Sequence, residues 1–222
     1  MVIEFKNVSV HINSKDILSD ISFSVPEGGK VALVGTSGAG KSSVLYALLG
    51  LLVPAAGEIL FMGKKVDVAS IDHVRSSVAY VGQEPVLGAV STVREALMLP
   101  FAYRANRRFK PDEETIKENL ELLRLPPGIL ENEIQTISGG EKQRIAICRG
   151  LLQKKKVFLL DEVTSALDKE SAQAVTALLS RDQFTFLSVS HHDEWIAVCD
   201  TIIEMNGGII LSMHGGARLG ND

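Results

Sequence analysis

The sequence predicts an α/β fold with a mostly parallel core sheet, an antiparallel β subdomain at the N-terminus and a helical subdomain inserted at about 92–152. Two observations support this prediction. Alternating apolar residues fill much of the first thirty positions, which is typical of paired antiparallel strands. Further along, short continuous apolar runs alternate with helical patterns, which is typical of βαβ units. We expect the chain, 1–222, to form a single domain with this insertion.

The N-terminal segment contains two alternating runs that would form strands. Apolar side chains at every second position line one face of a strand. Polar residues at 13–16 separate the runs, so we expect a turn there and direct pairing of the two strands. The alternating positions are Val8, Val10 and Ile12 in the first run, and Ile21, Phe23 and Val25 in the second.

The core sheet is predicted from three apolar runs, at 31–34, 157–160 and 184–189. A glycine-rich segment follows the first run, and residues 41–52 then read as a buried helix. Helical spacing of apolar residues between the other two runs gives the order strand, helix, strand, which predicts parallel pairing. These helical positions are Ala172, Val175, Leu178 and Leu179.

The inserted segment at about 92–152 is read as helical because it has almost no β-branched runs. Two capping boxes, Thr92 with Glu95 and Ser138 with Glu141, would each begin a helix.

Composition narrows the function classes. A net charge of −4 argues against a protein that binds nucleic acid through bulk positive charge, and no nucleic-acid partner is expected. The two cysteines lack CxxC spacing, so neither a disulfide framework nor a zinc knuckle is predicted. A reduced, cytosolic compartment is therefore expected. Gly50 and Pro54 interrupt an uncharged stretch at 42–57, so no spanning helix is predicted. Charges at positions 4 and 6 argue against a signal peptide.

A glycine-rich loop at 35–42 fits the pattern G-x-x-x-x-G-K-[ST] between a predicted buried strand and a helix. Backbone N–H groups in such a loop wrap phosphates, and the helix N-terminus adds positive potential. Lys41 would reach the β- and γ-phosphates, and Ser42 would ligate Mg²⁺. A tight glycine turn with an exposed lysine is the alternative. The residues expected to bind the nucleotide are Gly35, Thr36, Ser37, Gly38, Ala39, Gly40, Lys41, Ser42 and Ser43.

Two carboxylates, Asp161 and Glu162, end the apolar run at 157–160. A buried strand that ends in this way places Asp161 at the carboxyl edge of the sheet, beside the phosphate loop. Asp161 could then hold Mg²⁺, and Glu162 could orient and deprotonate an attacking water. The alternative is an ordinary strand end with solvated acids.

The segment Ile137-Ser138-Gly139-Gly140-Glu141-Lys142-Gln143-Arg144 resembles the signature sequence of ATP-binding-cassette (ABC) ATPases, with Glu141 where many members have glutamine. The resemblance extends from Phe5 to about Ile210 and includes the order of the motifs. Ser138 would cap a helix whose first residues, Gly139 and Gly140, leave N–H donors open to an anion. In the family, that anion is the γ-phosphate of ATP held by a second subunit.

The resemblance assigns three more positions. Gln83 resembles the Q-loop glutamine, which senses Mg²⁺ and the attacking water and faces the membrane partner; an isolated glutamine is usually a surface residue. Asp168 resembles the D-loop aspartate at the dimer interface and also suits a helix N-cap. His191 resembles the switch histidine that contacts the γ-phosphate. A metal site at 191–193 is disfavoured because adjacent strand residues point to opposite faces.

One position departs from the family pattern. Many members have an aromatic residue that stacks on adenine, and Ile12, flanked by His11, occupies that place. Ile12 could pack on the base without a π face, or be a strand residue at the sheet edge.

A basic cluster in the insertion is either a solvated loop or a contact with anionic lipid or a membrane subunit. Its residues are Arg104, Arg107, Arg108 and Lys110.

The resemblance implies a phosphate-loop triphosphatase that uses ATP and Mg²⁺. A second copy of the chain would complete an ATP sandwich, and a separate multispan membrane subunit would hold it at the cytoplasmic face of the cell membrane. A soluble ABC-type ATPase that acts on DNA or ribosomes is the alternative, although such proteins usually carry a long coiled-coil insertion or two cassettes. The segments at 92–100 and 125–130 are similar to ATPases of small iron-export-type transporters.

Overall fold

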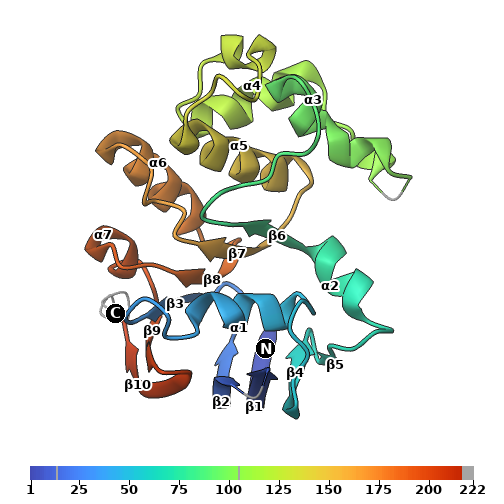
Figure 1. The fold of residues 1–222 in the computed structure, drawn as a ribbon. Helices are drawn as coiled ribbons and strands as arrows, with labels where there is room; N and C mark the ends of the chain where they lie inside the picture. Colours follow the sequence, from blue (N-terminus) through green and yellow to red (C-terminus); the bar gives the residue numbers. More distant parts are fainter. Residues whose placement is uncertain (14, 105, 217–222) are drawn as a thin grey trace.

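The computed structural model describes residues 1–13, 15–104 and 106–216, which form two sheets and a group of helices (Figure 1). The first sheet is antiparallel, as the alternating sequence predicts, and its strand order is β2-β1-β4-β5. Its strands are β1 (Ile3–Ile12), β2 (Lys15–Val25), β4 (Ala56–Phe61) and β5 (Lys64–Lys65).

The second sheet forms the core and has the strand order β10-β9-β3-β8-β7-β6. Every pairing in it is parallel except that of β10 with β9. The mostly parallel sheet is therefore confirmed. Its strands are β3 (Lys30–Val34), β6 (Val78–Val81), β7 (Val157–Asp161), β8 (Thr185–Val189), β9 (Thr201–Asn206) and β10 (Ile209–Gly215).

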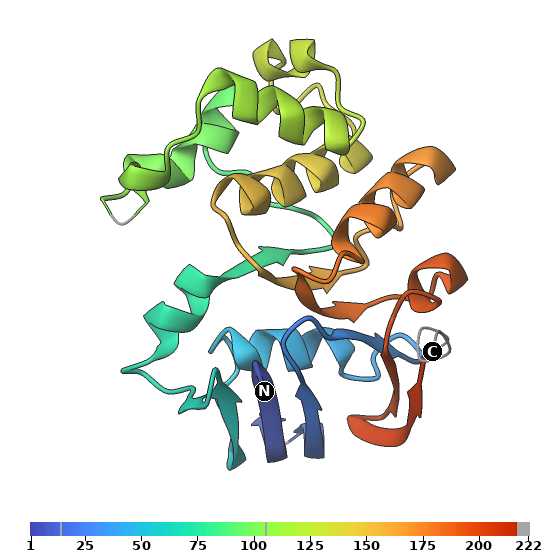
Figure 2. The ribbon, with the colours of Figure 1, turned by 180° about the vertical axis from the view of Figure 1, so that it is seen from behind.

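The helices cover the core sheet on both faces. Helix α1 lies between the two sheets, whereas α3, α4 and α5 stand together beyond β6 and β7, as the opposite views in Figures 1 and 2 show. The helices are α1 (Lys41–Leu48), α2 (Ile71–Ser77), α3 (Val93–Met98), α4 (Glu113–Leu122), α5 (Gly139–Leu152), α6 (Lys169–Leu179) and α7 (Asp193–Ile196). Short 3₁₀ turns are η1 (Leu99–Ala102), η2 (Arg107–Phe109) and η3 (Pro127–Glu131). None of the helices in the described part of the chain has the length and apolar character needed to cross a bilayer.

Each face of the core sheet packs into its own hydrophobic cluster. Leu159 and Leu187 point towards α1 and the antiparallel sheet, whereas Phe158 and Phe186 point towards the other helices. Successive strand residues alternate between faces, so a short, continuously apolar strand can fill both clusters. This explains why the runs in β7 and β8 show no alternation.

Two element boundaries differ from those predicted. Lys15 and Asp16 belong to β2 rather than to the turn, because Asp16 pairs with His11 across the hairpin. Helix α1 ends at Leu48 instead of continuing to position 52. Gly50 has a φ of 66°, and a Cβ there would lie 2.6 Å from the side chain of Ile71, so the chain must leave the helix at this point.

Phe186 provides a test of the core on the helical side. Its buried ring lies 5.1 Å from the ring of Trp195, between centroids, and both side chains are fully enclosed. Phe186→Ala should lower the free energy of unfolding by about 3–5 kcal/mol, because it leaves a cavity in the central strand. Urea unfolding measures this change. Val68→Ala is the control, since Val68 is 96% exposed, and a similar loss in both variants would contradict the assignment.

Candidate functional site

The carboxyl ends of β3, β8 and β7 meet at one edge of the core sheet, because these neighbouring strands are parallel. The glycine-rich loop follows β3, Glu162 follows β7, and His191 lies just beyond β8. A cavity of about 690 Å³ opens between these segments. Gln83, which follows β6, also lines it. Polar residues that lie far apart in the sequence therefore line the same cavity.

The phosphate loop has a backbone that only glycine adopts without strain at several points. Gly35, Gly38 and Gly40 have φ values of 138°, 78° and 94°. A Cβ on Gly35 would lie 2.0 Å from the carbonyl oxygen of Met205, so this position excludes any side chain. The loop therefore depends on β9 as well as on β3.

Lys41 is the first residue of α1 and lines the cavity. Its Nζ donates hydrogen bonds of 2.8 Å to the carbonyls of Gly35 and Thr36. The ammonium group is thus held at the glycine-rich loop, where the helix N-terminus also presents N–H donors. This arrangement suits the phosphates of a nucleotide.

Asp161 is only 5% exposed and accepts a hydrogen bond from the Ser42 hydroxyl. Burial raises the pKa of its carboxyl, and the charge of Glu162 raises it further, whereas Ser42 and Lys41 oppose the shift. A carboxylate and a hydroxyl oxygen beside a phosphate loop are the donors that Mg²⁺ prefers. Ser42 and Asp161 therefore fit a magnesium site, and Gln83 lines the same cavity.

Glu162 lies between the two other residues predicted to be catalytic. The Nε2 of Gln83 donates to its Oε2 at 3.2 Å, and the Nδ1 of His191 is 3.8 Å from its Oε1. Glu162 also has a φ of 52°, a strained conformation for a residue other than glycine. Such strain concentrates at functional sites, where the surrounding structure maintains it.

The structure adds Gln143, which the sequence reasoning missed. This fully buried side chain on α5 donates from Nε2 to the backbone carbonyls of Gln83, at 3.2 Å, and Glu162, at 3.4 Å. It thereby fixes the distance between two residues around the cavity. The available signal was its helical spacing with Ala146 and Ile147, which places a polar residue on the buried face of α5.

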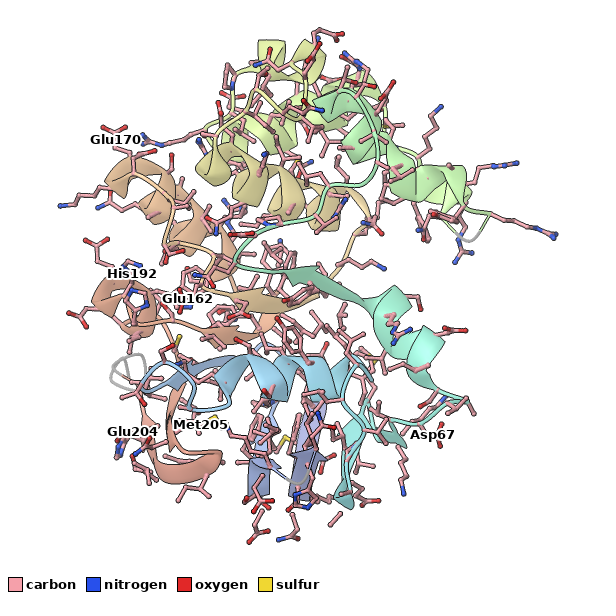
Figure 3. The ribbon with its side chains drawn as sticks, viewed as in Figure 1. Asp67, Glu162, Glu170, His192, Glu204 and Met205 are labelled. Carbon is pink, nitrogen blue, oxygen red and sulfur yellow. The ribbon has the colours of Figure 1, made fainter. Side chains whose placement is uncertain are left out.

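No role is predicted for His192, whose ring lies against that of His191. Its ring lies 4.4 Å from the ring of His191, between centroids, at an interplanar angle of 31°. Figure 3 shows His192 and Glu162 on the same side of the molecule. His192 therefore packs beside His191, which lines the cavity.

The signature residues do not line this cavity. Ser138, Gly139, Gly140 and Glu141 lie at the N-terminus of α5, and its capping box is confirmed, as is that of Thr92 with Glu95. A Cβ on Gly140 would lie 2.7 Å from the carbonyl oxygen of Ala166, so the signature packs directly on the segment before α6.

Asp168 caps α6, as its local pattern predicts. One carboxylate oxygen accepts from the Ser171 amide at 2.9 Å and the other from the Ser171 hydroxyl at 2.7 Å. These bonds lower the pKa of Asp168. Its proposed place at a dimer interface stays a prediction.

Ile12 is 41% exposed at the end of β1 and does not line the cavity. Lys15, Asp16 and Ile17 of β2 line it instead. The Nδ1 of His11 is 2.6 Å from a carboxylate oxygen of Asp16. This hydrogen bond joins β1 and β2 at the end of the hairpin, beside the opening. A base contact by Ile12 stays a prediction.

A phosphate loop after a buried strand, with an acid at the end of a nearby parallel strand, defines a phosphate-loop nucleotide-binding protein. The signature at the start of α5 narrows the class to ATP-binding cassettes. The chain belongs to the ABC transporter family, whose sequence model matches residues 18–165.

Known relatives agree with this assignment. The probable iron export ATP-binding protein FetA of Escherichia coli (strain K12) is 35% identical over 208 residues, which cover 92% of this chain and 91% of FetA. A sophorolipid transporter of Starmerella bombicola is 34% identical over 94% of this chain, which spans only 17% of that transporter. The dimeric post-hydrolysis ATP-binding cassette MJ0796, bound to ADP and Pi, has a TM-score of 0.84 at 26% identity, covering 96% of this chain and 98% of that one.

Lys41→Ala should reduce ATP affinity by about 10- to 100-fold, because it removes a charge-assisted hydrogen bond to phosphate. Folding should change little, since Lys41 bonds only to exposed loop carbonyls in the described structure. Fluorescent ATP titration and urea unfolding measure the two effects. Lys64→Ala removes the same charge from exposed β5 and should bind ATP normally. Unchanged affinity in Lys41→Ala would remove Lys41 from the phosphate site.

Asp161→Asn should increase the free energy of unfolding at pH 7 by roughly 1 kcal/mol, because it removes a buried charge. The folded-state pKa of Asp161 lies above its unfolded value, so the wild type gains stability as pH falls through that pKa. The advantage of Asn should therefore shrink in acid, while Mg²⁺-dependent ATP binding is lost at every pH. Urea unfolding from pH 7 to pH 4 tests the sign. An advantage that grows in acid would contradict it.

Proposed function

We propose that this chain hydrolyses MgATP as the nucleotide-binding subunit of an ABC transporter. The position of Glu162 is the observation that carries the proposal. Its carboxylate lies beside the phosphate-loop cavity, hydrogen-bonded by Gln83 and close to His191. A carboxylate in this place can accept a proton from a water aligned with the γ-phosphate.

Each residue at the cavity has a separate task in this reaction. The loop amides and Lys41 bind the phosphates, and Glu162 takes the proton of the attacking water. Gln83 orients the Glu162 carboxylate, and His191, which also lines the cavity, would contact the γ-phosphate. Mg²⁺, held by Ser42 and Asp161 with Gln83 nearby, would neutralise phosphate charge. Gln143 keeps the backbones of Gln83 and Glu162 in register.

The active form is proposed to be a head-to-tail dimer with two shared ATP molecules. The signature supports this because its open helix N-terminus lies away from the chain's own phosphate cavity. Ser138 would therefore bind the γ-phosphate held by a second copy. A dimer is also the state of the similar cassette MJ0796.

A second opening supports docking of a separate membrane subunit at the cytoplasmic face of the membrane. We define the docking groove as the cavity of about 670 Å³ lined by Leu51, Tyr80, Gln83 and Val86, among others. Leu51 is 61% exposed and Val86 is 83% exposed, which leaves apolar surface for a partner. Gln83 lines both this groove and the phosphate cavity, so docking and hydrolysis would share a residue.

Iron export is the proposed transport process, on the basis of similarity to FetA over 91% of its length. The transported species would be selected in the membrane subunit, and the described residues contain no cluster of three or more His, Cys, Asp and Glu side chains placed to bind a transported metal ion. Co-purification with a multispan membrane protein would separate a transporter subunit from a soluble ATPase acting on DNA or ribosomes.

Glu162→Gln should retain ATP binding, lose at least about 100-fold in turnover and form a dimer stable to size-exclusion chromatography with MgATP. The amide keeps the size of the side chain and cannot accept the proton, so the sandwich persists. Wild-type protein should dimerise only transiently.

Glu118→Gln is the control, since Glu118 is an exposed acid on α4, and it should behave as the wild type. A Glu162→Gln protein that stays monomeric at saturating MgATP would contradict the shared site. Retained turnover in this variant would remove Glu162 as the base.

A further inference from the structure

The helical subdomain carries a projecting positively charged segment, which we call the basic arm and define by its described residues, 103–104 and 106–110. Figures 1 and 2 show that the chain between α3 and α4, which includes η2, extends away from the packed helices. In Figure 3 nitrogen-tipped side chains point outward from this segment. Its exposed cations are Arg104, Arg107, Arg108 and Lys110.

The charge of the basic arm is not balanced locally. The segment contains no acid, and none of its four cations forms an ion pair within the described chain. Of the three acids that follow, Asp112 caps α4 and Glu113 forms a 2.8 Å ion pair with Arg94, whereas Glu114 is exposed and forms no ion pair with the arm among the described residues. A chain with a net charge of −4 thus presents a concentrated positive end.

Side-chain contacts within the basic arm hold it against the rest of the helical subdomain. Phe109 packs against the hydrophobic cluster of the helical subdomain, and the Arg108 guanidinium lies 4.6 Å from the centre of its ring. Asn106 donates a 3.1 Å hydrogen bond to the carbonyl of Pro100. Tyr103 is 65% exposed at the base of the arm, where an amphipathic ring suits a membrane interface.

The arm begins at the edge of the docking groove. Val86 lines the groove, and a Cβ on Gly88 would lie only 2.7 Å from the Leu99 side chain at the start of η1. Residues 86–88 therefore pack against the segment from which the arm extends. A membrane subunit seated in the groove would bring the surrounding lipid to the same side of the cassette as the arm.

We propose that the basic arm binds anionic phospholipid headgroups beside the membrane subunit; its place in the assembly rests on the proposed function. Guanidinium groups donate paired hydrogen bonds to phosphate oxygens, which favours arginine at such a surface. Each basic residue near an anionic leaflet increases partitioning about fivefold. The four cations together supply attraction that the acidic remainder of the chain lacks.

Vesicle co-sedimentation of the full chain tests the proposal. Wild-type protein should bind vesicles of 30% phosphatidylglycerol and 70% phosphatidylcholine in 0.05 M salt, and not vesicles of phosphatidylcholine alone. R104Q/R107Q/R108Q/K110Q should lose about 100-fold or more of the partition coefficient. Binding should weaken in 0.5 M salt and persist in millimolar inorganic phosphate, since a single free anion cannot replace a charged surface.

The matched control, K64Q/K65Q/K154Q/K156Q, removes the same charge from other exposed sites and should keep vesicle binding. Equal binding to neutral vesicles, an unaffected arm variant or an equal loss in the control would overturn the proposal. An arm variant that binds vesicles normally yet no longer co-purifies with the membrane subunit would assign the arm to a protein contact instead. ATPase activity, measured on the same samples, should be unchanged; its absence from all of them would refute the proposed function without affecting the vesicle result.

Discussion

The parallel pairing of β3, β8 and β7 is the constraint on which the site depends. Because these strands run in the same direction, the phosphate loop, His191 and the two acids at the end of β7 all lie at one edge of the sheet. The register places Val189 of β8 beside both Leu33 and Asp161. A shift of one residue in either pairing would move every side chain of the strand to the opposite face of the sheet. Packing in the two hydrophobic clusters therefore sets the positions of the polar residues at the strand ends.

Local backbone strain is the second requirement of the site. Gly35 can approach the carbonyl of Met205 only because it lacks a Cβ, and Glu162 keeps a left-handed backbone. That conformation is held by the amide of Glu162, which donates to Val189, and by Gln143, which donates to the carbonyl of Glu162. The strain is local, whereas the contacts that maintain it come from distant parts of the sequence. Hydrolysis would therefore depend on the rigidity of these supporting contacts as much as on the reacting groups.

The sequence predicted features that are encoded locally. Spacing revealed the phosphate loop, both capping boxes and the buried strands, because each depends on residues a few positions apart. It could not place Gln143 between Gln83 and Glu162, since these contacts join three separate elements. It also extended α1 beyond Leu48, because the close approach of Ile71 to Gly50 is a tertiary contact. The family resemblance assigned Ile12 to the base by register, whereas the residues around the opening come from the adjacent strand.

In the proposed dimer, each ATP is bound by the phosphate loop of one chain and the signature of another. Mixing two inactive variants measures this directly. Lys41→Ala impairs the loop, and Gly139→Asp places a negative charge at the start of α5, where the nearest neighbour of a Cβ is 3.9 Å away and acidic residues suit the helix. A mixed dimer would contain one intact composite site, so we expect ATPase activity in the mixture that neither variant shows alone. A mixture as inactive as its components would contradict the shared site.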